Sequence, residues 1–223
     1  RARGFELVSP RPGQTPTPAE LAELLPECVA WLAGVERIDA AVLAHAPALR
    51  VISRNGSGVD SIDLAEAARR GVTVVRAEGS NAEGVAQLAM TLILTAMRCI
   101  PPATAALREG RWSRTIGAEL ADVTVGVVGL GAIGARVAQI FALLGAEVIA
   151  HDPYAPRGWC PLLAMDELVD DADVVTLHCP PSPDCLPVID FARLSNHRRC
   201  RIRVNTRPSS LVVSGALLAA PDS

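Results

Sequence analysis

The chain has 223 residues, of which half are apolar and only 3% are aromatic, and its formal net charge is −3. A chain of this length forms one large domain or two small ones, and a core of Ala, Val, Leu and Ile suits an α/β protein. The charge creates no basic field for nucleic acid, and no apolar run is long and uncharged enough to span a bilayer. We therefore expect no nucleic-acid partner and no membrane partner.

The six cysteines are scattered without Cys-x-x-Cys spacing, and the four histidines include no pair at the spacing of metal ligands. We therefore expect no metal site. The cysteines are interpreted as reduced thiols of a cytoplasmic protein. Residues 1–9 do not have the pattern of a signal peptide.

In the first third of the chain, short apolar runs alternate with helical patterns. The runs predict strands at 5–8, 29–32, 49–53 and 72–75. The helical patterns lie at 17–25, 38–46 and 63–71. Repeated βα alternation of this kind indicates a parallel sheet.

A loop with two glycines begins at Arg54, where the strand at 49–53 ends. Loops at the carboxyl ends of parallel strands are where open α/β sheets bind ligands. The backbone amides of Asn55, Gly56 and Ser57, together with the Arg54 side chain, can hold a carboxylate. The alternative is an ordinary turn with a solvated arginine.

A long helix is expected from Val85 to Met97, because this segment is apolar on nearly every face. Such a helix is buried on more than one side, so it can connect two domains and also pack against a second subunit. A break in the pattern at 80–84 fits a domain boundary. A pair of prolines is expected to interrupt the helix, before a further helical segment at 103–109.

The most informative segment is VGVVGLGAIG, in which a run of β-branched residues ends in Gly129-x-Gly131-x-x-Gly134. A helical pattern follows, and then a second short apolar strand that leads to Asp152. Strand, glycine turn, helix, strand and acid therefore occur in that order.

Each position in this order has a physical reason. Gly129 permits the tight turn out of the strand, Gly131 lets a pyrophosphate approach the backbone, and Gly134 lets the helix pack close to the sheet. Free amides and the positive end of the helix dipole face the phosphates, while Asp152 can accept hydrogen bonds from an adenosine ribose. The order predicts a dinucleotide site. The alternatives are a glycine-rich turn in some other α/β domain and, for Asp152, a strand-end turn residue.

Two further strands end on the same side of the predicted sheet. A buried strand at 174–178 leads into His178-Cys179-Pro180, and a strand at 202–204 leads towards Thr206. By the rule for parallel sheets, both loops face the cofactor. His178 is placed where a base could act, but a strand-end histidine near the cofactor without a proton-transfer role is the favoured interpretation.

Several segments together carry a resemblance to a known family. They are RNGSGVDSIDLAEAARRGVTV, NAEGVAQLAMTLILTAMR, REGRW, VGVVGLGAIGARVAQIFALLGAEVIAHDPY, MDELVDDADVVTLHCPP and VNTR. Along nearly its whole length the chain resembles the D-isomer-specific 2-hydroxyacid dehydrogenases, the group that includes phosphoglycerate dehydrogenase. The resemblance implies two similar α/β domains with the active site in the cleft between them. It also implies an oxidoreductase in which NAD exchanges hydride with a 2-hydroxy or 2-keto acid.

The fold expected on these grounds is α/β, with two βα-alternating domains. Residues 1–82 would form a partial substrate-binding domain. Residues 83–223 would form a partial NAD-binding domain with a Rossmann-type doubly wound parallel sheet, truncated at its C-terminal end. The helix from Val85 to Met97 resembles the one that the family uses in its dimer contact, so a homodimer is expected.

The resemblance also implies roles for individual residues. Arg54, Asn55, Gly56 and Ser57 match the loop that binds the substrate carboxylate. Arg207 matches the catalytic arginine that orients the keto acid. The residues matched to the cofactor site are Gly129, Gly131, Ala132, Ile133, Gly134, Asp152, His178, Cys179, Pro180 and Thr206.

The chain also departs from the family pattern. The glutamate and histidine that deliver the proton in the family lie beyond Ser223 by this comparison, and arginines crowd the strand before Thr206. We therefore expect an incomplete or damaged chain with impaired activity. The alternatives are a catalytically inactive NAD-binding module, similar to NAD-sensing corepressors, and a remnant that does not fold stably.

Overall fold

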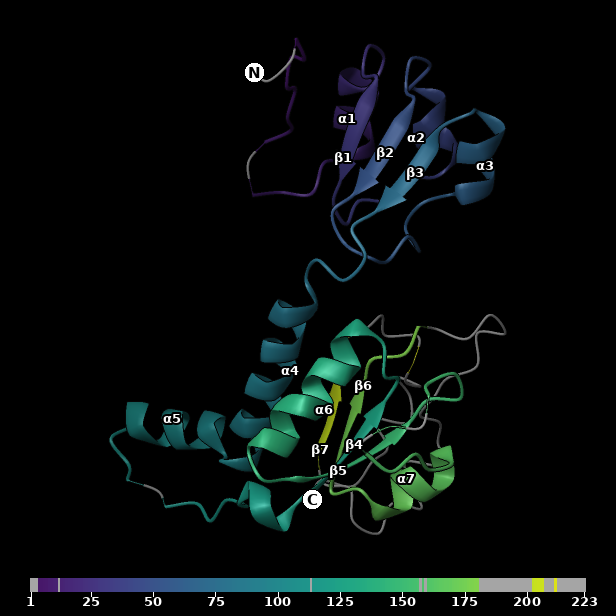
Figure 1. Ribbon diagram of the computed structural model, residues 1–223. Helices are drawn as coiled ribbons and strands as arrows, with labels where there is room; N and C mark the ends of the chain where they lie inside the picture. Colours follow the sequence, from purple (N-terminus) through teal and green to yellow (C-terminus); the bar gives the residue numbers. More distant parts are fainter. Residues whose placement is uncertain are drawn as a thin grey trace. The chain divides into compact units, whose positions relative to one another are not determined.

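The computed structural model describes residues 4–11, 13–112, 114–156, 158, 160–180, 202–206 and 211. The chain divides into two compact units, Arg1–Asn81 and Ala82–Ser223. Each unit contains a parallel β-sheet with helices packed against it (Figure 1). The predicted α/β class, with alternating strands and helices, is confirmed.

The first unit contains a three-stranded sheet in the order β1-β2-β3. Its strands are β1 (Ala30–Ala33), β2 (Val51–Arg54) and β3 (Thr73–Arg76). Its helices are α1 (Pro18–Leu24), α2 (Ala40–Ala44) and α3 (Leu64–Arg69). An oxygen-bearing side chain precedes each helix and accepts a hydrogen bond from a first-turn amide, as helix starts require. These side chains belong to Thr17, Asp39 and Asp63.

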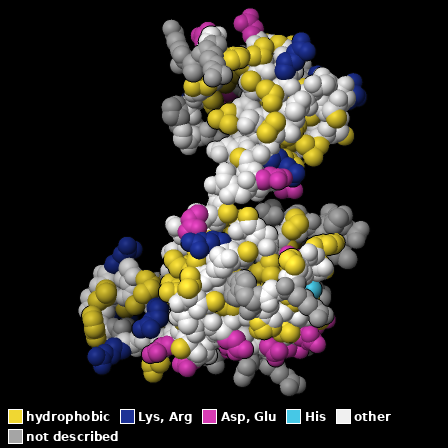
Figure 2. Space-filling view, viewed as in Figure 1, with side chains coloured by type: hydrophobic (Ala, Val, Ile, Leu, Met, Phe, Trp, Pro, Cys, Tyr) yellow, Lys and Arg dark blue, Asp and Glu magenta, His cyan; other side chains and the backbone are white. Residues whose placement is uncertain are grey.

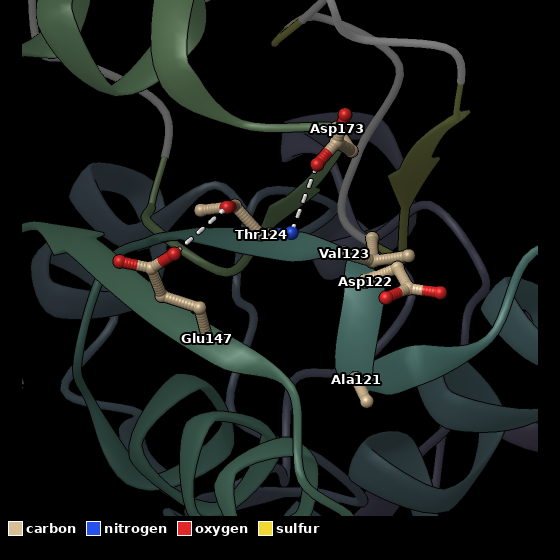
Figure 3. A pocket seen from close by; sticks show the side chains of 6 residues that line it. All are labelled: Ala121, Asp122, Val123, Thr124, Glu147 and Asp173. Atoms are coloured by element: carbon tan, nitrogen blue, oxygen red, sulfur yellow. Dashed lines mark hydrogen bonds between the residues drawn. The ribbon is translucent and has the colours of Figure 1, made fainter.

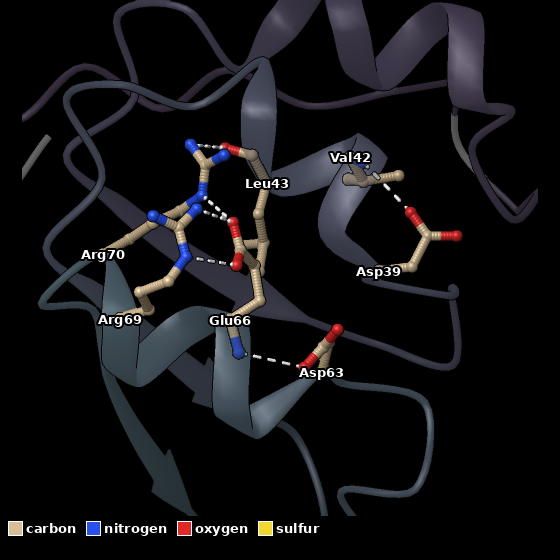
Figure 4. A network of polar contacts seen from close by, with 7 residues as sticks. All are labelled: Asp39, Val42, Leu43, Asp63, Glu66, Arg69 and Arg70. Carbon is tan, nitrogen blue, oxygen red and sulfur yellow. Dashed lines mark hydrogen bonds and ion pairs between the residues drawn. The ribbon is translucent and has the colours of Figure 1, made fainter.

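A charged network ties the end of α3 to α2 (Figure 4). Glu66 accepts hydrogen bonds from Arg69 Nε at 2.8 Å and from Arg70 Nε at 2.6 Å. Arg70 also donates through Nη1 to the Leu43 carbonyl at 3.1 Å. The hydrogen bonds from the two guanidinium groups lower the pKa of Glu66 to about 2.

The second unit contains a four-stranded parallel sheet in the order β5-β4-β6-β7. Its strands are β4 (Thr124–Val128), β5 (Glu147–His151), β6 (Val174–Leu177) and β7 (Ile202–Asn205). Its helices are α4 (Ala82–Met97), α5 (Ile100–Arg108), the 3-10 turn η1 (Leu120–Asp122), α6 (Ala132–Leu143) and α7 (Met165–Asp171). One apolar cluster joins the sheet to α4 and α6, and a second joins its other face to α7. Helices on both faces explain why β4 and β6 read as continuous apolar runs.

The strand predicted at 5–8 is wrong. No strand forms there, and the side chains of Phe5, Leu7 and Val8 are exposed. An apolar run becomes a strand only where a neighbouring strand shares its hydrogen bonds, and no described strand pairs with this segment.

The predicted interruption of the long helix is confirmed, but the break lies just before the two prolines rather than at them. Pro101 lies in the first turn of α5, where an amide has no acceptor within the helix and proline is tolerated. The break between α4 and α5 occurs instead at Cys99, whose φ of 50° is left-handed. A non-glycine residue in that region cannot continue an α-helix.

Helix α4 buries one face against α6 and β7. Ala89 and Ile93 on this face are fully buried, whereas Leu88 and Leu92 are 51% and 42% exposed. Hydrophobic side chains also reach the surface over α5 (Figure 2). The prediction of burial on more than one side is therefore not met within this unit.

Among the described residues, no single helix is both long enough and apolar enough to cross a membrane. Helices α4 and α5 reach that length and apolar character only as a pair, and the pair is bent by 63°.

Candidate functional site

The glycine turn after β4 has almost no space for side chains. Gly129 has a φ of +89°, and a Cβ placed on it would lie 2.6 Å from the Cys179 amide nitrogen. A Cβ on Gly134 would lie only 1.8 Å from the Gly129 carbonyl oxygen. Both positions therefore require glycine, the first for its backbone conformation and both for close packing. These are the structural roles that the sequence motif predicts for them.

Gly131 differs from its neighbours because its missing side chain leaves an open space. No described heavy atom lies within 4 Å of a Cβ placed there. Gly131 is the N-cap of α6, and no described side chain caps this helix. Ala132 is exposed and Ile133 is half-buried in the first turn. The uncapped amides and the positive end of the helix dipole therefore face an accessible surface that suits a phosphate group.

Asp152 anchors this turn at the end of β5. Its Oδ2 accepts a hydrogen bond from the Leu130 amide at 2.8 Å. Its Oδ1 accepts from the amides of Tyr154 at 2.8 Å and Ala155 at 3.2 Å. Burial raises the pKa of Asp152, but these three hydrogen bonds outweigh burial and hold the pKa below its usual value. An ionised carboxylate can accept about four hydrogen bonds in total, so a ribose hydroxyl would share a group that is already largely engaged.

The loop after β6 packs directly against the glycine turn. The His178 amide donates to the Val128 carbonyl at 2.8 Å, and the Cys179 backbone lies against Gly129. The His178 side chain is buried, while Cys179 is half-buried and Pro180 is exposed. The structure thus brings His178, Cys179 and the glycine turn together. The imidazole of His178, however, is directed at threonine hydroxyls on Thr176 and Thr206.

Three of the four histidines lie among the described residues, and the imidazoles of two of them, His151 and His178, have local partners. His45 is the C-cap of α2 in the first unit. His151 Nδ1 lies 2.9 Å from the Leu163 carbonyl oxygen. His178 is held between two hydroxyls, as described above. His197 and Arg207, the predicted catalytic arginine, lie outside the described residues.

The loop predicted to hold a carboxylate follows β2 in the first unit. The Asn55 amide donates to the Ala33 carbonyl at 2.9 Å, and the Gly56 amide donates to the Arg54 carbonyl at 2.9 Å. These two amides are therefore engaged within the unit. The guanidinium of Arg54 donates through Nη1 to the Asn55 carbonyl, and its buried Nε has no described partner.

One buried carboxylate at the same sheet edge was missed from the sequence. Glu36 is 8% exposed, and its Oε1 accepts a hydrogen bond from the Gly34 amide at 2.9 Å. It lies in the loop after β1, next to the strand that carries Arg54. A glutamate between a strand and a helix carries no sequence signal of burial, because most glutamates in such loops are solvated.

A polar pocket lies at the opposite edge of the second sheet, where strands begin (Figure 3). Asp173 accepts a hydrogen bond from the Thr124 amide at 2.9 Å, and the Thr124 hydroxyl donates to Glu147 at 3.3 Å. These bonds join the amino ends of β4, β5 and β6. Ligands of open α/β sheets bind at the carboxyl ends, so we assign this pocket a structural role. Within the described part of the chain, no three acidic, histidine or cysteine side chains are grouped to hold a metal ion.

Comparisons with known proteins agree with this geometry. Residues 90–223 match the NAD binding domain of the D-isomer specific 2-hydroxyacid dehydrogenases. D-3-phosphoglycerate dehydrogenase of Mycobacterium tuberculosis (strain H37Rv) is 41% identical over 209 residues, which are 90% of this chain and 40% of that protein. The chain therefore spans well under half the length of this relative.

Solved structures show the same fold. The TT0316 protein from Thermus thermophilus is 34% identical, with a TM-score of 0.86 over 93% of this chain and 69% of that one. D-Lactate dehydrogenase from Aquifex aeolicus, solved with NAD and lactic acid, is 26% identical, with a TM-score of 0.78 over 86% of this chain and 60% of that one.

The second unit thus has the sheet, the glycine turn and the strand-end acid of an NAD-binding domain, and most of it matches that domain of one family. NAD is the cofactor of this domain. The chain belongs to the family of D-isomer-specific 2-hydroxyacid dehydrogenases.

Proposed function

We propose that the chain is part of an NAD-dependent 2-hydroxyacid dehydrogenase of the phosphoglycerate dehydrogenase type, with the second unit holding NAD and the first contributing to the substrate site. The open face of Gly131 at the uncapped start of α6 is the observation that carries this proposal. A pyrophosphate at this position would receive hydrogen bonds from the first-turn amides of Ala132 and Ile133.

The remaining residues have distinct roles in this proposal. Asp152 receives an adenosine ribose, because its carboxylate already lies beside the glycine turn. Cys179 and Pro180 line the adenosine side, and Thr206 lines the nicotinamide side. When bound, the nicotinamide supplies the hydride chemistry. Arg54 binds the carboxylate of a 2-hydroxy or 2-keto acid, and Arg207 orients its keto group.

We also propose that turnover by this chain alone is low. Reduction of a ketone needs a proton at the developing alkoxide, and a positioned acid contributes roughly 10²–10⁴ in rate. The imidazoles of His151 and His178 have local partners, and His45 is an exposed residue at the end of α2 in the first unit, not a residue of the loops after β4, β6 or β7. The same contacts favour a second candidate function, an NAD-binding module that does not catalyse turnover.

Two further properties belong to the proposal. The chain forms a homodimer through the exposed apolar face of α4, since Leu88 and Leu92 are half-exposed there. The protein works in the cytoplasm, which is supported by the scattered spacing of its cysteines and by the four described ones lying outside any disulfide.

The test of NAD binding is Gly131→Val. Its side chain would enter open space in the unliganded protein, so the melting temperature should change little, whereas a pyrophosphate could no longer approach the backbone. We expect NAD affinity, measured by calorimetry, to fall by a factor of at least about 100, equivalent to roughly 3 kcal/mol.

The matched control is Gly84→Val, because Gly84 on α4 is also exposed and also has no described atom within 4 Å of a Cβ position. It should leave NAD affinity unchanged. Equal NAD affinity for Gly131→Val and the unchanged chain would contradict the proposed cofactor site.

A further inference from the structure

Two polar side chains lie on an otherwise apolar face of the second sheet. Thr176 is fully buried, and His178, two positions later in the chain, is 6% exposed. The sheet residues around them belong to the cluster that α4 and α6 cover: Val125, Val127, Val174 and Val204. A polar group in such a place destabilises the fold unless it is hydrogen-bonded. Its partners therefore indicate what the group does.

The imidazole of His178 is held by a hydroxyl on each side. Thr176 Oγ1 lies 2.9 Å from Nε2, and Thr206 Oγ1 lies 3.5 Å from Nδ1. A neutral imidazole has one donor nitrogen and one acceptor nitrogen, and a hydroxyl can serve as either partner. The short contact to Thr176 orients the ring, and the oriented ring presents its other nitrogen to Thr206.

The strand register explains why these residues meet. Leu177 of β6 is opposite Asn205 of β7, so the residues that follow them, His178 and Thr206, are neighbours at the carboxyl edge of the sheet. A Cβ placed on Gly134 would lie 3.3 Å from the His178 Cβ. The histidine therefore lies under the start of α6 and reaches the residue that follows β7.

We propose that His178 is a positioning residue for Thr206, the residue that follows β7. Its ring, oriented by Thr176, holds the Thr206 hydroxyl and so sets the part of the NAD site that Thr206 forms. The histidine transfers no proton in this role. The part played by Thr206 in NAD binding rests on the proposed function, whereas the hydrogen-bonded line from Thr176 to Thr206 does not.

The decisive variant is Thr176→Val, which removes one hydroxyl and keeps the shape of the side chain. Thr176 is fully buried, so it cannot touch a bound dinucleotide. We expect NAD affinity to fall about two- to tenfold, the effect of one hydrogen bond. In a His178→Asn background, the same substitution should cause no further loss, because residues that act through one another are not additive.

The matched control is Thr124→Val, at the opposite edge of the same sheet, where the hydroxyl donates to Glu147. It should not change NAD affinity. Thr206→Val should lower the affinity more than Thr206→Ser, since serine retains the hydroxyl that the ring holds.

A second readout does not depend on the cofactor. In the chain without NAD, the Asn205 and Thr206 amides should exchange hydrogen faster in Thr176→Val than in the unchanged chain, and at the unchanged rate in Thr124→Val. Additive losses of NAD affinity for Thr176→Val and His178→Asn, or unchanged exchange at 205–206, would overturn the inference. If the unchanged chain does not bind NAD, the proposed function fails, and hydrogen exchange alone decides the role of His178.

Discussion

The Asp152 carboxylate accepts a hydrogen bond from the Leu130 amide at 2.8 Å, across 22 positions of sequence. The acid that would meet the ribose is thus also the residue that holds the turn in front of α6. The same side chain therefore stabilises the fold and, in the proposed function, also binds NAD.

Asp152→Asn should destabilise the chain even without ligand, by about 1–2 kcal/mol, because an amide group cannot accept hydrogen bonds through both of its terminal atoms. Urea unfolding measures the change. Asp170→Asn is the control, since Asp170 is exposed on α7. Equal stability of the two variants would show that the Leu130 contact contributes little.

The same side chain should make stability depend on pH. The pKa of Asp152 is lowered in the folded chain, so its contribution is complete above the unfolded value of about 4 and is lost as pH falls through the lower folded value. The stability gap between the unchanged chain and Asp152→Asn should be constant near neutral pH and narrow below about pH 4. A gap that widens on acidification would contradict this assignment.

NAD should bind more tightly than NADP. The carboxylate of Asp152 can accept from ribose hydroxyls but repels a 2′-phosphate, and no described arginine directly follows it to offset that charge. Calorimetric titration of both dinucleotides measures the preference. We expect at least about a tenfold difference, or roughly 1.4 kcal/mol, and equal or tighter NADP binding would contradict it.

In the first unit, Arg70→Ala should destabilise the fold more than Arg69→Ala. Both arginines pair with Glu66, but only Arg70 also reaches the Leu43 carbonyl of α2. We expect a difference of about 1 kcal/mol between the two variants in urea unfolding of the first unit. Since the pKa of Glu66 is lowered to about 2, the ion pairs of Glu66 with both arginines should persist at neutral pH and be lost between about pH 4.5 and pH 2. The difference between the two variants should remain across that range, because the Leu43 carbonyl does not titrate. Identical unfolding of the two variants would mean that the link to α2 is not stabilising.

Self-association should depend on the exposed face of α4. Leu92→Glu places a charge on that face and should convert a dimer to a monomer in sedimentation at micromolar concentration. Leu107→Glu on α5, where the side chain is 56% exposed, is the control and should leave the dimer intact. A monomeric unchanged chain would show that α4 does not form the contact.

Sequence order predicted most of the fold because the signals were local. The glycine positions, the capping residues and the period of the apolar runs each constrain a few neighbouring residues, and the structure has the corresponding turn, helix starts and strands. The run at 5–8 failed because a strand depends on a distant partner that its own residues do not specify.

The sequence predicted at which edge of the sheet the site residues lie, but not which way their side chains and amides point. The sequence put His178 at the edge that faces the cofactor, yet its ring is turned towards Thr176 and Thr206 by strand register. The sequence predicted that the amides of Asn55 and Gly56 are available to a ligand, but in the folded loop both donate to backbone carbonyls. Which groups hydrogen-bond to one another depends on how the elements pack, and the order of residues in the sequence does not specify this.

The contact between Gly129 and Cys179 joins two loops that belong to different βα crossovers. Backbone meets backbone there, with no side chain between them to absorb a change in spacing. A methyl group at 129 would overlap the Cys179 nitrogen, and one at 134 would overlap the carbonyl of the same turn. The contact between these two loops therefore leaves no room for even one additional carbon atom. We therefore expect substitutions elsewhere in the sheet to disturb this contact chiefly when they change the distance between β4 and β6.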